Sequence, residues 1–171
     1  SFDAIDFFIT HFPNHSRIRE IWVWNLERIC RIPEKQQQLA GAANYWHNQN
    51  PESYWPFFHM ARTDIMADPI TANIPELVDN AKRILAKPPT SDQPLGINPT
   101  DWEKWKNREQ AYLSYFLARY WHLSGNLDAS KQIFQEIYQS KIINMDPMFL
   151  FHYAFLLEAL HEKDMAIHFF I

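Results

Sequence analysis

The spacing of apolar residues is the feature that most limits how this chain can fold. Between residues 113 and 121 they fall at i, i+3, i+4, i+7 and i+8: Leu113, Phe116, Leu117, Tyr120 and Trp121. This spacing lines one face of an α-helix. A second stripe runs over residues 127–138, after Gly125, and glycine favours the left-handed backbone at which many helices end. The stretch therefore predicts an antiparallel pair of helices.

Helix-start signals and periodicity extend this prediction along the chain. Asn50-Pro51 and Asp146-Pro147 each pair a good N-cap with a proline suited to the first turn, and Thr100 and Asn73 begin capping-box patterns. We expect helices near residues 2–11, 16–30, 34–48, 52–67, 75–87, 101–123, 126–142 and 147–160, with a last one beginning at Lys163. No segment alternates apolar and polar residues over the length of a strand. Three Gly are also few for a β-rich fold, so the predicted class is all-α with no β-sheet.

The helices follow a repeat. Small residues mark the second helix of each expected pair, at Ala4, Ala42, Ala81, Ser130 and Ala166. The longest spacing contains a proline-rich insertion at 88–100; without it the period is roughly 37–39 residues, within the range of helical-hairpin repeats. The pattern A-I-x-F-F-I occurs at both ends of the chain, at 4–9 and 166–171. We expect one domain over 1–171, a right-handed α-solenoid of about four antiparallel hairpins cut from a longer protein.

Residues 111–138 resemble a tetratricopeptide repeat. Leu117 is followed by the small Ala118, Gly125 stands at the turn, and Ser130 and Phe134 follow in the second helix. Residues 147–170 are similar, so the resemblance is clearest over 110–171. Half-a-tetratricopeptide repeats, found in RNA-processing scaffolds, are the second choice, because residues 153–158 resemble their Y-A-x-x-E motif with the glutamate one place late. The resemblance implies a superhelix whose first helices line a concave groove.

Candidate partner-binding residues lie on one face of each first helix, because positions i, i+3, i+7 and i+10 point the same way. They are Trp55, Phe58, Arg62, Tyr112, Tyr115, Arg119, His122, Phe151, Phe155 and Glu158, with Met148 beginning the last series. Aromatic rings with a forked guanidinium donor suit peptide capture. The alternative is that these rings pack against neighbouring helices. If they form the groove, replacing Tyr115 and Arg119 by Ala abolishes binding with little change in melting.

Composition and motifs argue against other functional classes. The net charge of −4 without a large block of one sign gives no case for nucleic acid binding, and no apolar run approaches the ~20 residues of a membrane span. Cys30 is the single cysteine, so it has no partner for an intramolecular disulfide. Glu158 and His161 form a lone E-x-x-H, whereas a di-metal bundle needs two of these and two more Glu. No catalytic residue, metal ligand or cofactor is predicted.

The function expected from these observations is non-catalytic: a scaffold that binds a peptide or protein surface in the groove of a tetratricopeptide-like superhelix. Two alternatives stay open. The segment is an accessory or regulatory soluble domain of a larger enzyme or bacterial envelope assembly, with the activity elsewhere, or its aromatic groove binds a small molecule or sugar. A soluble segment of this kind suits the cytoplasm or the periplasm, and the sequence leaves the oligomeric state open.

Overall fold

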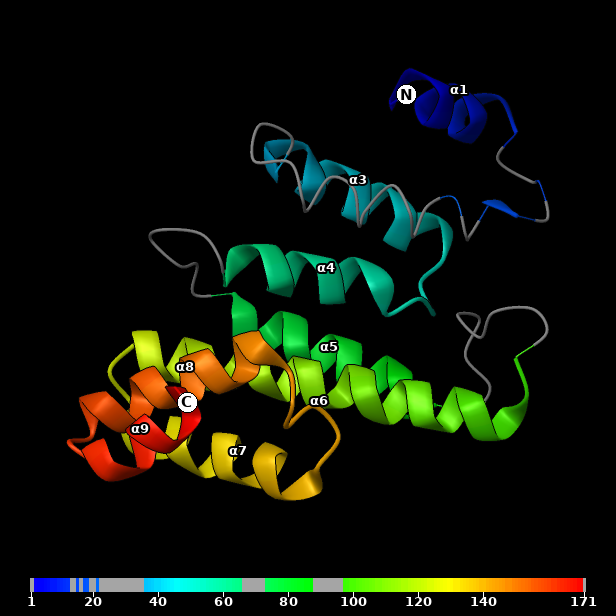
Figure 1. The fold of residues 1–171 in the computed structure, drawn as a ribbon. Coiled ribbons are helices and arrows are strands. Elements are labelled where there is room, and N and C mark those ends of the chain that lie inside the picture. Colours follow the sequence, from blue (N-terminus) through cyan, green and yellow to red (C-terminus); the bar gives the residue numbers. More distant parts are fainter. Residues whose placement is uncertain are drawn as a thin grey trace.

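The computed structural model describes residues 2–12, 15, 17, 18, 21, 36–65, 73–87 and 97–170 (Figure 1). The described residues form helices and the turns between them, with no strand, so the all-α prediction is confirmed for them. The helices are α1 (Phe2–His11), α3 (Gln36–Gln49), α4 (Trp55–Asp64), α5 (Ile74–Leu85), α6 (Pro99–Leu123), α7 (Leu127–Ser140), α8 (Pro147–Ala159) and α9 (Lys163–Phe170). Most of the helix expected at 16–30, with Cys30, and most of the insertion at 88–100 lie outside the described residues.

The helix starts test the capping predictions. At α8 the expected cap forms: Asp146 Oδ1 accepts hydrogen bonds from the backbone N–H groups of Met148 at 2.9 Å and Phe149 at 3.1 Å. At α6 the prediction is wrong by two residues, because Asn98 rather than Thr100 is the cap, and its Oδ1 accepts from the Asp101 N–H at 2.9 Å. Pro99 therefore occupies the first turn, where its missing N–H costs nothing.

Two other helix starts also differ from expectation. Asn73 precedes α5, but its side chain makes no capping hydrogen bond. Asn50 does not cap a helix; its carbonyl accepts from the Ser53 N–H at 3.0 Å in a turn, and α4 begins at Trp55. The Ser53 hydroxyl is buried and accepts from the Trp46 indole N–H at 3.1 Å, which holds this turn against α3.

The helices pack in chain order. From α3 to α9 each described helix contacts the next one, and α6 also contacts α4 and α8, which lie two steps away from it. Within the described part of the chain no helices further apart than this touch, and α1 touches none. Figure 1 shows the result: the chain advances from the blue α1 at one end to α8 and α9 at the other.

Aromatic side chains fill the core between α6, α7 and α8. The Phe134 ring stacks on Tyr153 with centroids 5.2 Å apart and 3° between the planes, and Phe149 lies 5.4 Å from Phe134. Ser130, buried at the start of α7, donates a hydrogen bond to the Ala118 carbonyl at 2.8 Å. A small residue is needed there because α6 and α7 approach closely. Ala81 and Ala166 are buried as well, whereas Ala4 is exposed.

The turns that follow α6 and α8 have the same backbone. Gly125 and His161, 36 residues apart, both take positive φ values, 82° and 62°. In each turn the residue after them donates to a carbonyl five residues earlier: Asn126 to Trp121 and Glu162 to Leu157, both at 2.8 Å. This is the Schellman motif. The α6–α7 and α8–α9 turns therefore share one backbone geometry, 36 residues apart.

Candidate partner-binding face

The predicted residues of α6 lie on one side of that helix and meet α8. The Tyr112 hydroxyl donates to Asp146 Oδ2 at 2.8 Å, and the Tyr115 hydroxyl donates to the Met148 carbonyl at 3.4 Å. The Arg119 guanidinium reaches the His152 ring, with Nη1 2.9 Å from Nδ1. One turn of helix separates each of these α6 residues from the next, so the spacing argument grouped them correctly.

Arg119, Tyr115 and His152 form a half-buried polar cluster between α6 and α8. The Tyr115 hydroxyl also lies within hydrogen-bond distance of His152 Nδ1, and the two rings stack with centroids 5.7 Å apart. Burial, followed by the neighbouring Arg119 and His122, lowers the pKa of His152 to about 4. Burial, followed by the Arg119 charge, also lowers the pKa of His122. At neutral pH His152 is therefore an uncharged acceptor for the cationic Arg119.

Burial also sets the protonation of the two tyrosines. It raises the pKa of Tyr115 to about 12, against the opposing charge of Arg119. It raises the pKa of Tyr112 to about 12 too, with the hydrogen bond to Asp146 adding to the effect. Both hydroxyls stay protonated and act as donors. Among the described residues no carboxylate forms an ion pair with Arg119, and its hydrogen-bond partner there is the neutral His152 ring.

The structure corrects the expectation that Tyr115 and Phe58 face a partner. Each is only 6% exposed. Tyr115 packs among Phe134 and Phe149, and Phe58 packs edge-on against Phe116 at 5.4 Å. For Tyr115 and Phe58 the alternative stated from the sequence is therefore correct: their rings pack against neighbouring helices. Replacing Tyr115 by Ala removes buried ring volume, so the double variant with Arg119 is expected to lower stability as well as any binding.

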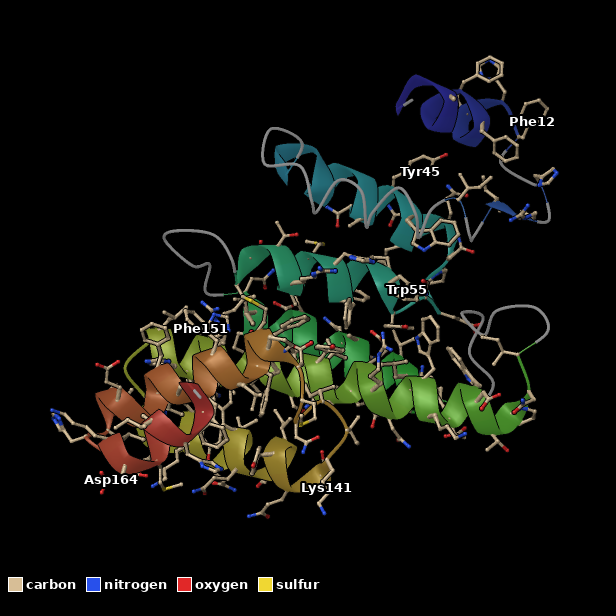
Figure 2. The ribbon with its side chains drawn as sticks, in the orientation of Figure 1. Phe12, Tyr45, Trp55, Lys141, Phe151 and Asp164 are labelled. Atoms are coloured by element: carbon tan, nitrogen blue, oxygen red, sulfur yellow. The ribbon has the colours of Figure 1, made fainter. Side chains whose placement is uncertain are left out.

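Trp55 and Arg62 of α4 are half-buried beside α6. Trp55 is labelled in Figure 2. It stacks on Tyr54 at 4.7 Å and on His59 at 5.5 Å, and its ring lies 6.4 Å from Trp105. The charges of Arg62 and Arg108 interact electrostatically with Glu109, a buried carboxyl of α6. Burial raises the pKa of Glu109 to about 7 although both arginines lower it.

Sequence reasoning missed Glu109, Asp146 as a partner of Tyr112, and His152. Glu109 stands three residues before Tyr112 and thus continues the same face, which was a usable signal. Nothing in the sequence pointed to His152, because its contacts depend on how α8 lies against α6.

The predicted residues of α8 are exposed. Phe151, labelled in Figure 2, lies on this helix and is 44% exposed. Met148 is 49% and Phe155 42% exposed, and Glu158 is exposed one turn further along. The Phe151 and Phe155 rings meet edge to face, with centroids 4.6 Å apart. We call these four residues the α8 face. It offers two rings, a thioether and a carboxylate, which can bind apolar and cationic groups but carry no nucleophile.

Three further findings bear on the class of protein. No group of three or more potential metal ligands occurs among the described residues. None of the described helices is both long and apolar enough to cross a bilayer. No family model, curated protein or solved structure matches the chain, so its function has to be argued from this face and this fold.

Proposed function

We propose that this chain is a non-catalytic interaction module, a tetratricopeptide-like stack of helical hairpins that binds a protein partner through its first helices. Two features support the repeat architecture. The described helices contact neighbours one or two steps along the chain, which is the packing expected of solenoids, and two turns with the same backbone lie 36 residues apart, as in a helical-hairpin repeat. In this scheme α4, α6 and α8 are first helices.

The observation that carries the proposal is the composition of the α8 face. Three large apolar side chains, each 42–49% exposed, lie on one side of a single helix. Side chains of this kind, clustered rather than scattered, are typical of protein-binding surfaces. Phe151 and Phe155 offer large rigid contact area with few rotatable bonds, and the Glu158 carboxylate at the edge adds a charged contact.

The test is affinity capture with the full chain as bait and an extract of its own cells. In the bait variant Phe151→Ser with Phe155→Ser, we expect the specific interactors to fall by at least about tenfold, the effect of losing one or two interface hot spots. The matched control changes Met165 and Ile167 to Ser, two exposed apolar residues of α9. Retention of the same interactors by the α8 variant would contradict the proposal, provided that its circular dichroism is unchanged.

A further inference from the structure

Three basic side chains meet where the C-terminal half of α6 faces α8. Arg119 and His122 stand three residues apart on α6 and so share one side of that helix, and His152 comes from α8. Arg119 Nη1 lies 2.9 Å from His152 Nδ1, and the charges of Arg119 and His122 both reach the His152 ring. Each of the three residues is half-buried, so part of each remains accessible to solvent.

The acidic group near this cluster is already engaged. Asp146 is the carboxylate whose charge reaches His152. Its Oδ2 accepts the hydrogen bond from Tyr112, and its Oδ1 accepts from backbone N–H groups in the first turn of α8. Among the described residues no carboxylate pairs with Arg119. The cluster therefore carries positive charge without an anion of the described chain in contact with it.

The cluster also has hydrogen-bond donors to spare. A guanidinium offers five N–H donors in a fixed plane, and the contact of Arg119 with the His152 ring uses only Nη1. The His122 ring makes no hydrogen bond to another side chain or to the backbone in the described part of the chain. Donors from two helices are therefore open to an acceptor supplied from outside.

We propose that Arg119, His122 and His152 form a binding site for a phosphate group. The arginine fork matches two phosphate oxygens, and a protonated imidazole donates to a third. Three donor side chains on two helices suit an anion with oxygens on several sides better than a planar carboxylate with two. This site is separate from the α8 face, and it stands or falls independently of the proposed function.

The proposal implies that binding and protonation are coupled. In the free protein burial, followed by the Arg119 charge, lowers the pKa of His122. A bound dianion favours the protonated imidazole, so the protein takes up a proton as it binds. The other titratable groups at this contact are Asp146, Tyr112 and Tyr115. Both tyrosine hydroxyls stay protonated, because burial raises their pKa to about 12.

Titration of the full chain with inorganic phosphate at constant ionic strength, followed by NMR of the histidine rings, tests the site. We expect Arg119→Gln to weaken binding at least about tenfold, the effect of losing a charge-assisted hydrogen bond. Arg83→Gln is the matched control. It removes an exposed arginine of α5 that donates to Asn80 Oδ1, and should leave the affinity unchanged. Equal affinity in Arg119→Gln and the native chain would overturn the site.

His122→Gln gives a second test, independent of whether Arg119→Gln folds. Sulfate is the probe, because its charge stays constant between pH 6 and pH 8 whereas that of phosphate changes. We expect the native chain to bind sulfate several-fold more tightly at pH 6 than at pH 8, and His122→Gln to lose most of this difference. A native affinity that does not change with pH would remove His122 from the site and overturn the three-residue assignment.

Two further probes define the ligand. We expect acetate to bind at least about tenfold more weakly than phosphate, since it has two oxygens in place of four. Equal affinity for acetate would overturn the assignment to phosphate. Glycerol phosphate distinguishes the source of the group. Binding as tight as that of inorganic phosphate assigns the site to the phosphate ester of a larger molecule, and markedly weaker binding assigns it to the free anion; both results support a phosphate site.

Discussion

Glu109 holds a carboxyl group inside the contact between α4 and α6, where only 4% of the residue is exposed. Burial raises its pKa to about 7, although Arg108 and Arg62 both favour the charged form. The cost of removing a carboxylate from water therefore exceeds the attraction of two nearby cations. Near neutral pH this residue changes charge in the folded protein.

The first prediction concerns the pH dependence of stability. The folded pKa of Glu109 is about 7 and the ordinary value is 4.5, so its contribution to stability is complete below pH 4.5 and is lost as the pH rises through 7. Glu109→Gln removes this loss. Between pH 4 and pH 8 we therefore expect the free energy of unfolding of the variant to rise by about 3 kcal/mol relative to that of the native chain.

Urea denaturation at the two pH values measures this gain. Glu76→Gln, a change of an exposed carboxyl in the first turn of α5, serves as the matched control and should show no such gain. If the free energy of unfolding changed equally with pH in Glu109→Gln and in the native chain, Glu109 would not have the raised pKa on which this prediction rests.

Local periodicity predicted that Tyr112, Tyr115 and Arg119 share a face, and it did so without any tertiary information. It did not predict that the Arg119 guanidinium would bond to His152, because the two residues belong to different helices. The exposure of Tyr115 was mispredicted for the same reason. A ring at a given place on a helix is covered or exposed according to the helix that lies next to it.

At the scale of elements, the two equivalent turns differ in their chemistry. Gly125 adopts the left-handed backbone at no steric cost, but His161 adopts it at a φ of 62° with a side chain attached. The glycine at position 125 predicted the first turn from the sequence alone. The second has the same hydrogen bonds without the glycine signal, so packing of α9 on α8 and the Schellman bonds must offset the backbone strain.

The second prediction is that His161→Gly raises the free energy of unfolding by about 1 kcal/mol, because glycine relieves the left-handed conformation. Thermal or chemical denaturation measures it. Gly125→Ala is the reciprocal change and should lower stability by a similar amount. A Cβ at Gly125 would meet no atom within 4 Å, so its cost is backbone strain alone. A loss of stability in His161→Gly would show that the histidine side chain contributes more than its strain costs.

At the scale of the whole molecule, the packing order limits how far a disturbance can travel. The described helices contact neighbours one or two steps along the chain, so α4 and α5 share no contact with α8 or α9. In such an arrangement stability is close to a sum of local terms and nearest-neighbour terms. Regions of different stability can then open separately.

The third prediction tests this locality. Leu157 is fully buried in α8, and Leu157→Ala should cost about 2–5 kcal/mol. We expect hydrogen exchange to accelerate in α8 and in α6, α7 and α9, which contact α8 directly, while α4 and α5, which do not contact α8, keep most of their protection. An equal loss of protection in all these helices would indicate a single cooperative unit instead.

The sequence alone determined the helical class, most helix positions, the hairpin turn at Gly125 and the grouping of side chains on each helix face. All of these depend on residues within a few positions of one another, where the geometry of one helical turn decides the outcome. The tertiary structure decided which face each neighbouring helix covers. Spacing placed Tyr115 and Phe151 on the predicted faces of their helices, yet one is buried and the other 44% exposed. That difference comes from the contact of α8 with α6, which joins residues more than thirty positions apart and so leaves no trace in local periodicity.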